Sequence, residues 1–130
     1  MNKAMNKPTE HDEQCALFSW AARMEYHHPE LRLLFAVPNA GKRSIGSAMY
    51  YKAEGLKSGV PDIFLPFPNG VHHGLIIEMK VKGGKVSENQ KAWLDALTME
   101  YYAVHVCWSF EEAKSVICKY LSIDEAKNDY

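Results

Sequence analysis

Two acidic residues and a lysine stand at the ends of neighbouring apolar segments of this chain. Asp62 precedes the apolar segment 63–65, and Glu78 and Lys80 follow the apolar segment 75–77. Successive side chains of a strand point to opposite faces, so Glu78 and Lys80 share one face if their segment is a strand. If the two segments pair, Asp62 joins them. Two carboxylates beside an ammonium group suit a hard divalent cation with an activated water, which is the chemistry of phosphodiester hydrolysis.

A Glu-x-Lys triplet is by itself a weak signal. Charged pairs across strands are common and usually mark a solvated face, and Asp62 directly after Pro61 could simply cap a turn. The position of the triplet strengthens the catalytic interpretation, because charged side chains are disfavoured beside an apolar segment such as 75–77 unless the protein uses them. We therefore expect Asp62, Glu78 and Lys80 to be catalytic, with the solvated face and the turn cap as alternatives.

Polar residues on a first predicted helix are candidates for the same site. Thr9 and Asp12 resemble a capping box, which predicts a helix over 10–27. Glu13, near the start of this helix, could reach over the sheet as a further metal ligand, or it could only complement the helix dipole. Glu10 competes for the ligand role.

Gln90 is a candidate from a second helix. Ser87 and Gln90 form an S-x-x-Q capping box that predicts a helix start. Because this helix begins soon after the strand that carries Glu78, the Gln90 side chain could also reach the site. The sequence leaves the capping role and the active-site role open.

The remaining elements follow from turn residues and apolar spacing. A loop that contains Pro68-Asn69-Gly70 predicts an antiparallel hairpin of two strands, 62–67 and 74–80. Further strands are predicted at 31–37 and 102–107, and further helices at 44–54, after Ser87 and after Ser109. The order is α-β-α-β-β-α-β-α, which predicts an α/β fold with a mixed central sheet flanked by helices.

The size and composition of the chain fit one domain. It has 130 residues, 47% of them hydrophobic, which is enough for a real core. The core is expected over about 9–122, with a flexible leader at 1–8 and a polar tail at 123–130. The 3 cysteines form no C-x-x-C pair, which favours reduced thiols in a cytosolic protein. No apolar run approaches the length of a membrane span.

A formal net charge of −1 gives no global sign of nucleic-acid binding, so DNA contacts must depend on local charge. The basic loop 38–43 follows a predicted strand, and its cations could hold phosphates or could form an ordinary solvated turn. The side chains expected to contact DNA are Asn39, Lys42, Arg43, Lys82 and Lys85. The histidine pairs at 27–28 and 72–73 lack further ligands at zinc spacing and are expected on the surface.

Taken in order, these residues resemble the VRR-NUC family, the virus-type replication-repair branch of the PD-(D/E)xK nucleases. The resemblance runs from Glu10 to Leu121. It is carried by the segments 10–14, 37–39, 41–43, 52–55, 59–62 and 77–80, by Gly84-Lys85-x-Ser87-x-x-Gln90 and by Trp93. Each segment is modest alone, and their order and spacing together make the signal specific.

The resemblance implies a restriction-endonuclease-like core and a stand-alone, phage-type endonuclease in the cytoplasm of a bacterial cell. The implied activity is metal-dependent hydrolysis of DNA. Stand-alone members resemble homodimeric resolvases that act on branched DNA such as four-way (Holliday) junctions. Two active sites that face a two-fold symmetric junction suit a symmetric dimer.

The family's pattern also implies roles for single residues. Asp62 and Glu78 would bind Mg²⁺ or Mn²⁺ with the help of a backbone carbonyl near Met79. Glu13 would complete the metal site from the first helix. Lys80 would orient or activate the attacking water and stabilise the charge on the phosphate.

Gln90 is implied to support the active-site strand. After the helix that carries Gln90, this chain has Tyr101-Tyr102 where the family usually has Gly-Tyr. The difference removes the expected left-handed stop of the helix, which leaves the end of this helix open.

Two other functions fit the same sequence. A module of the same fold could hold branched DNA or a partner protein without cutting, although a complete Asp-Glu-Lys set argues against a degenerate domain. A phage structural or assembly protein could use its apolar faces for oligomer contacts. Metal binding that depends on Asp62 tests the first alternative. The second would show neither metal dependence nor a preference for branched DNA.

Overall fold

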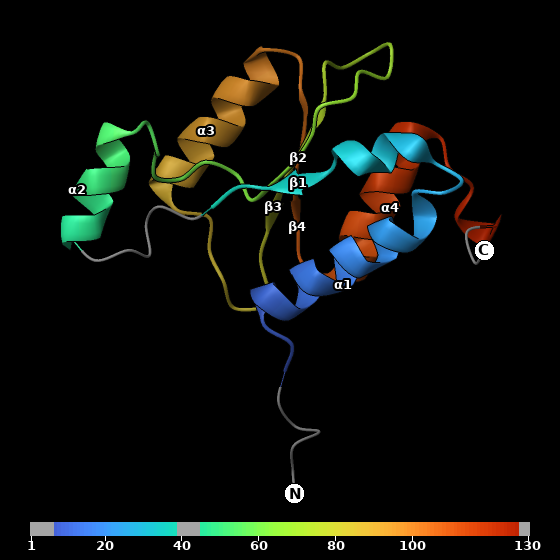
Figure 1. Cartoon of the computed structure of the whole chain (residues 1–130), viewed down its shortest axis with the longest axis horizontal. Helices are drawn as coiled ribbons and strands as arrows, with labels where there is room; N and C mark the ends of the chain where they lie inside the picture. Colours follow the sequence, from blue (N-terminus) through green and yellow to red (C-terminus); the bar gives the residue numbers. More distant parts are fainter. Residues whose placement is uncertain (1–6, 39–44, 128–130) are drawn as a thin grey trace, which may run out of the picture.

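The computed structural model describes residues 7–38 and 45–127, and within these residues the strands form one mixed sheet (Figure 1). Across the sheet the order is β1 (Phe35–Ala36), β2 (Ile63–Leu65), β3 (Leu75–Met79) and β4 (Ala103–Cys107). The pairs β1–β2 and β2–β3 are antiparallel, and β4 runs parallel to β3. The predicted hairpin of β2 and β3 is therefore confirmed, with Ile63 opposite Ile77.

Helices flank this sheet, as the sequence predicts. They are α1 (Glu10–Met24), α2 (Ile45–Ala53), α3 (Glu88–Met99) and α4 (Phe110–Leu121), with short 3-10 helices η2 (Pro29–Leu33) and η4 (Glu125–Lys127). α1 and α4 pack together on one side of the sheet, and α3 lies on the other side (Figure 1). α3 connects the parallel strands β3 and β4, because a tight turn cannot join parallel neighbours. Among the described residues, no helix is long and apolar enough to cross a membrane.

The main core lies between the sheet and the pair of helices α1 and α4. Its residues come from both layers, among them Leu17, Trp20, Ile77, Met79 and Ile117. Alternation along β3 turns Ile76 and Glu78 to the opposite face, on the side of α3. Every residue of β3 is buried, which makes it a central strand whose two faces are both covered.

The strand predicted over 31–37 is wrong for most of its length. η2 occupies its first part, and only residues 35–36 pair with β2. Leu31 and Leu34 are buried while Leu33 between them is exposed. A spacing of three residues between buried side chains is that of a 3-10 turn. In a strand, Leu31 and Leu33 would lie on the same face and would be buried or exposed together.

α3 ends in a left-handed residue even though that residue is not glycine. Tyr101 has φ 67°, and the backbone N–H of Tyr102 donates to the carbonyl of Leu97 at 3.2 Å. The carbonyl of Tyr101 accepts a hydrogen bond from His73 N–H at 2.9 Å, which ties it to the loop before β3. The stop expected of a glycine is thus made by a tyrosine, whose Cβ makes this conformation costly.

Some element bounds, and the burial of one residue, differ from the sequence prediction. α1 ends at Met24, short of the predicted 27, and the backbone N–H groups of His27 and His28 close its last turn on the carbonyl of Met24. Ile123, placed by the sequence in the polar tail, is buried in the main core. The helix predicted at 44–54 is confirmed as α2, although Ser44 lies outside the described residues.

Candidate active site

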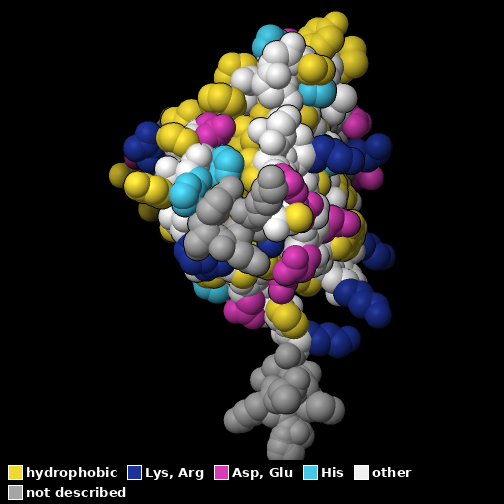
Figure 2. Space-filling view, turned by 90° about the vertical axis from the view of Figure 1, so that its right-hand side faces the viewer, with side chains coloured by type: hydrophobic (Ala, Val, Ile, Leu, Met, Phe, Trp, Pro, Cys, Tyr) yellow, Lys and Arg dark blue, Asp and Glu magenta, His cyan; other side chains and the backbone are white. Residues whose placement is uncertain are grey.

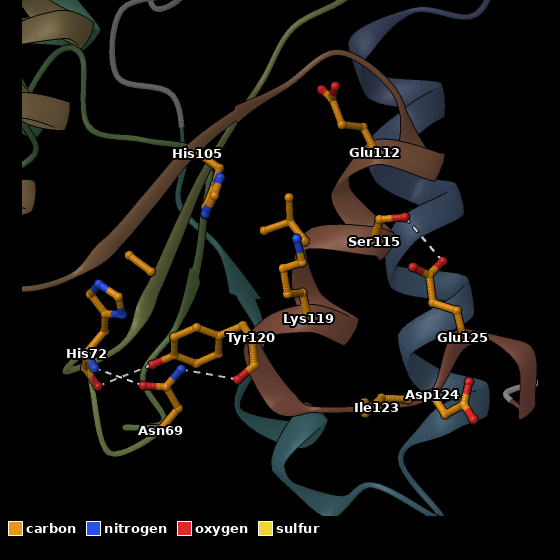
Figure 3. Close-up of a pocket in the computed structure, with 12 residues that line it drawn as sticks. Asn69, His72, His105, Glu112, Ser115, Lys119, Tyr120, Ile123, Asp124 and Glu125 are labelled. Carbon is orange, nitrogen blue, oxygen red and sulfur yellow. Dashed lines mark hydrogen bonds between the residues drawn. The ribbon is translucent and has the colours of Figure 1, made fainter.

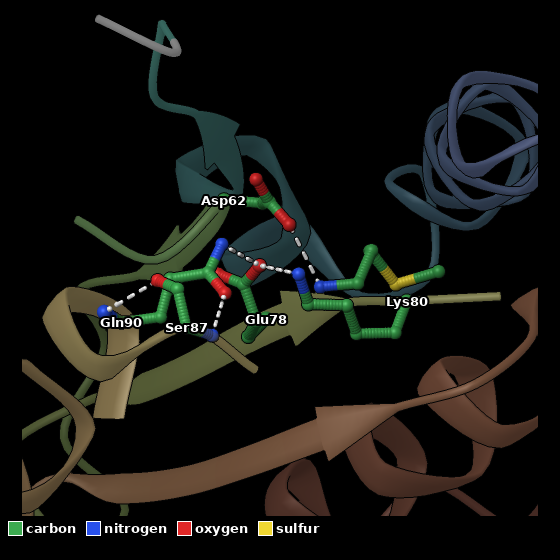
Figure 4. Close-up of polar contacts among 6 residues, drawn as sticks. Asp62, Glu78, Lys80, Ser87 and Gln90 are labelled. Carbon is green, nitrogen blue, oxygen red and sulfur yellow. Dashed lines mark hydrogen bonds and ion pairs between the residues drawn. The ribbon is translucent and has the colours of Figure 1, made fainter. Parts of the chain in front are cut away.

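The pairing of β2 with β3 brings Asp62 to Glu78, as the sequence predicts. Asp62 directly precedes β2, and its Oδ2 accepts a hydrogen bond from the backbone N–H of Met79 at 2.8 Å (Figure 4). Glu78 and Lys80 follow on one face of β3 and its extension, and both are buried, at 1% and 7% exposure. A solvated strand face is therefore excluded for these two side chains.

The two oxygens of the Glu78 carboxylate have different surroundings. Oε2 accepts a hydrogen bond from Nε2 of Gln90 at 3.0 Å and lies 3.7 Å from Nζ of Lys80 (Figure 4). Oε1 is buried and has no hydrogen-bond partner among the described residues. Because buried polar atoms are almost always paired, this oxygen points to a ligand.

Burial and neighbouring charge both act on the protonation of Glu78. They raise its pKa to about 8, first because burial disfavours the charged form and then because the Asp62 carboxylate is close. The ammonium of Lys80 lowers the pKa of Glu78, and the carboxylate of Glu10 raises it further. The site thus concentrates negative charge that a divalent cation would neutralise.

Gln90 performs both of the roles that the sequence left open. Its Oε1 accepts a hydrogen bond from the backbone N–H of Ser87 at 2.8 Å. The backbone N–H of Gln90 donates to Oγ of Ser87 at 3.1 Å, which completes the capping box of α3. Its Nε2 remains free for Glu78. The start of α3 and the orientation of the carboxylate are therefore coupled through one side chain.

A glycine lets the chain before Asp62 pack closely on the start of α3. Gly59 has φ +86°, and a Cβ built on it would lie 2.8 Å from the backbone carbon of Asn89. Nδ2 of Asn89 donates to Oγ of Ser58 at 3.4 Å beside this contact. The close approach positions Gln90, next to Asn89, relative to the strand that begins after Asp62.

The structure does not bring Glu13 to these carboxylates. Oε1 of Glu13 accepts the backbone N–H of Phe110 at 2.6 Å, so this side chain caps the start of α4 from α1. Glu10 instead lines a cavity of about 320 Å³ together with Asp62. Its Oε2 and the Cδ of Lys80 lie 3.7 and 3.6 Å from the position that a Cβ on Gly84 would occupy.

Glu10 is therefore the helix carboxylate that faces the site, and the expectation placed on Glu13 is not supported. The two residues are less than one turn apart on α1, so spacing alone could not choose between them. The choice depends on how α1 packs against α4, which no local pattern records. Met79 takes part through its N–H, while a ligand role for its carbonyl stays a prediction.

The predicted DNA contacts fall into two groups. Asn39, Lys42 and Arg43 lie outside the described residues. Lys82 and Lys85 are exposed in the connection between Lys80 and α3. Their contact with DNA stays a prediction.

The residues present fit a hard divalent cation. Asp62 and Glu78 offer carboxylate oxygens, which Mg²⁺ and Mn²⁺ prefer, and Glu10 faces the same space. The Oε1 of Glu78, which has no hydrogen-bond partner among the described residues, is the acceptor such a cation would satisfy. No three His, Cys, Asp or Glu side chains in the described part of the chain form a metal cluster by themselves. Water and phosphate oxygens would therefore complete the coordination.

A larger cavity lies elsewhere, between β4 and α4. It has a volume of about 730 Å³ and is lined by residues that include His72, His105, Lys119 and Tyr120 (Figure 3). Asp62, Glu78 and Lys80 do not line it. This cavity is thus separate from the residues with hydrolytic chemistry.

A mixed sheet flanked by helices, with Asp, Glu and Lys at the ends of two paired central strands, defines a nuclease-type, restriction-endonuclease-like fold. The family model described as VRR-NUC domain matches residues 2–111, and the chain belongs to this family. A solved structure described as a VRR_NUC domain protein is similar, with a TM-score of 0.78 and 26% identity over 92% of this chain and 93% of that chain. Among curated proteins there is no match.

Proposed function

We propose that the protein is a metal-dependent endonuclease that hydrolyses phosphodiester bonds in branched DNA. The observation that carries this proposal is the carboxylate of Glu78, which is buried and lies beside Lys80. One of its oxygens has no hydrogen-bond partner in the described part of the chain. Keeping such a group out of water costs free energy, and groups of this kind cluster at functional sites. Membership in a nuclease-related family supports the same class of reaction.

Each residue of the site has a role in this reaction. Asp62 and Glu78 would hold Mg²⁺ or Mn²⁺ through their carboxylate oxygens, and Glu10 would add negative charge from α1. The bound cation would polarise the scissile phosphate and lower the pKa of a bound water. Lys80 places positive charge where the phosphate oxygens gain negative charge in the transition state. Gln90 fixes the orientation of the Glu78 carboxylate through its hydrogen bond to Oε2.

Branched DNA is the proposed substrate and a homodimer the proposed assembly. With a net charge of −1, the protein has little general attraction to duplex DNA, so we expect shape to decide its choice of substrate. Lys82 and Lys85 would contact phosphates beside the site. A symmetric dimer would present two such sites to a two-fold symmetric junction.

The test is cleavage of a labelled four-way junction and of a matched linear duplex, each with Mg²⁺, Mn²⁺ or EDTA. We expect metal-dependent cutting of the junction by the wild type. Lys80→Ala and Glu78→Gln should each lower the rate roughly 100- to 1,000-fold, because each removes charge stabilisation from the transition state. Thermal unfolding of both variants checks that they remain folded.

Wild-type rates in either variant would overturn the assignment of the site. Tight, shape-selective binding without cutting in any metal would instead make the protein a binding module of the same fold. Calorimetric titration with Mn²⁺ shows whether the protein has a metal site, with Asp62→Asn as the matched variant. A metal site binds Mn²⁺ in the wild type and loses this binding in Asp62→Asn.

A further inference from the structure

A partly exposed tryptophan lies where β4 ends beside the active-site strand. Trp108 directly follows β4 and is 42% exposed. The residue before it, Cys107, accepts the backbone N–H of Lys80 at 2.9 Å. The chain at Trp108 therefore leaves the sheet next to the segment that continues from Lys80.

Two lysines and this tryptophan line one small cavity. It has a volume of about 300 Å³, and its walls include Lys7, Val81, Lys82 and Trp108. Neither lysine forms an ion pair with another described residue. Glu13 also borders the cavity, but its Oε1 is bound to the N–H of Phe110. Figure 2 shows lysine and arginine side chains along the flank of the molecule near the start of the described chain.

The backbone at Trp108 is fixed on both sides. Its N–H donates to Oε1 of Glu112 at 2.6 Å, which ties it to the first turn of α4. On the other side it continues β4, whose last residue pairs with Met79. An aromatic side chain on such a support needs little further ordering when a planar group stacks on it.

We infer that Trp108, Lys7 and Lys82 form a subsite that binds an unpaired nucleotide of the substrate strand. The indole would stack on the base, and the two ammonium groups would neutralise the flanking phosphates. Proteins that hold single strands combine these two elements, because every base offers a π face and every nucleotide a negative charge. This inference rests on the proposed function.

The position of the subsite relates it to the scissile bond. Lys82 is two residues after Lys80, and two extended residues span at most about 7 Å. A nucleotide held here therefore belongs to DNA close to the bond that is cut. Bases inside a duplex have both faces stacked, so the subsite would favour substrates whose nucleotides beside the cut are unpaired, such as flaps or splayed arms.

The experiment measures binding in EDTA, separately from cleavage. Full-length protein is titrated into a labelled oligo-dT strand and into a blunt duplex, with fluorescence anisotropy as the readout. Trp108→Ala should weaken binding of the single strand roughly 5- to 150-fold, and Trp108→Phe should retain most of it. Lys82→Ala should reduce the slope of log K against log salt by about 0.7. Duplex binding should change little in the Trp108 variants.

Exposed residues away from the subsite supply the controls. Tyr26→Ala removes an aromatic ring that is 87% exposed, and Lys119→Ala removes a lysine near the opposite end of α4. Neither should affect binding of the single strand. Thermal unfolding and sedimentation of every variant separate a loss of fold or a change of oligomer from a loss of contact.

Three results would overturn the subsite: no measurable binding of the single strand by the wild type, unchanged binding by Trp108→Ala, or equal losses on single strand and duplex. A changed oligomeric state in Trp108→Ala would place the ring in a protein interface and also overturn it. Failure of the nuclease proposal has a different signature, because wild-type protein would then bind in EDTA and cut nothing with metal.

Discussion

The side-chain amide of Gln90 lies 3.0 Å from Oε2 of Glu78 and at the same time closes the capping box at the start of α3. One residue thus joins the first turn of a helix to the buried carboxylate of the central strand. This link predicts that stability and activity can be separated by two neighbouring substitutions.

Gln90→Ala should impair the site more than the fold. Without the amide, the Glu78 carboxylate loses a hydrogen bond that orients it, and the affinity for Mn²⁺ should fall roughly 10- to 100-fold. Ser87→Ala is the matched variant, because it removes only the cap and should lower the free energy of unfolding by about 1 kcal/mol. Calorimetric titration with Mn²⁺ and urea unfolding measure the two effects. Equal metal affinity in the wild type and Gln90→Ala would contradict the prediction.

Glu10 and Glu13 should give opposite phenotypes. Glu10→Gln removes a carboxylate that faces Asp62, so metal affinity and cleavage should fall while stability changes little. Glu13→Gln weakens the charged cap on the N–H of Phe110 and should lower the free energy of unfolding by about 1 kcal/mol with activity retained. Urea unfolding and cleavage kinetics of both variants test this. The reverse pattern would restore Glu13 as the metal ligand.

The metal-free protein should lose stability as pH rises because of Glu78. Its pKa is about 8 in the folded state against an ordinary 4.5, so the folded state holds the proton more tightly than the unfolded state. The stabilisation is complete below about pH 4.5 and is lost as pH rises through about 8, by an amount on the order of a few kcal/mol. Urea unfolding in EDTA between pH 5 and pH 9 measures it.

Glu78→Gln is the control for this pH dependence, since an amide does not titrate. The wild type should lose more stability than Glu78→Gln over this range, and saturating Mn²⁺ should reduce the difference. Parallel curves for the two proteins in EDTA would show that Glu78 titrates in its ordinary range.

Gly59→Ala should disturb both the fold and the site. The added Cβ would lie 2.8 Å from the backbone of Asn89, at a residue whose φ of +86° is left-handed. We expect the free energy of unfolding to fall by at least about 1–3 kcal/mol and the cleavage rate to fall as well. Gly55→Ala is the matched control, because Gly55 has φ +101° with no atom within 4 Å of the added Cβ. Gly55→Ala should lose only the free energy of unfolding that an alanine at this φ costs, and it should keep its cleavage activity. Similar activity losses in both variants would exclude a positioning role for the contact.

Local patterns in the sequence predicted most of the elements. The capping boxes at Thr9 and Ser87 form as expected, because they need only residues three positions apart. The hairpin of β2 and β3 follows from its turn residues and apolar alternation. The prediction of a strand at 31–37 was wrong because a short apolar segment fits a 3-10 turn as well as a strand.

Tyr101 shows where local rules were overridden by tertiary contacts. The sequence lacks the glycine that usually ends such a helix, yet Tyr101 adopts φ 67°. Its carbonyl bonds to His73 N–H, and its ring lies 6.3 Å from that of His73. These contacts with the loop before β3 hold a conformation that a tyrosine alone would disfavour.

The sequence by itself determined which chemical groups the site contains, because Asp62, Glu78 and Lys80 stand at positions set by strand periodicity and one hairpin. Only the tertiary structure decided that Glu78 is buried, with one oxygen that no other described residue hydrogen-bonds. It also decided that Glu10 faces the site while Glu13 caps α4. The physical reason is that burial and cross-element hydrogen bonds depend on how helices pack on the sheet. Those contacts join residues far apart in the chain, and no local pattern of residue types specifies them.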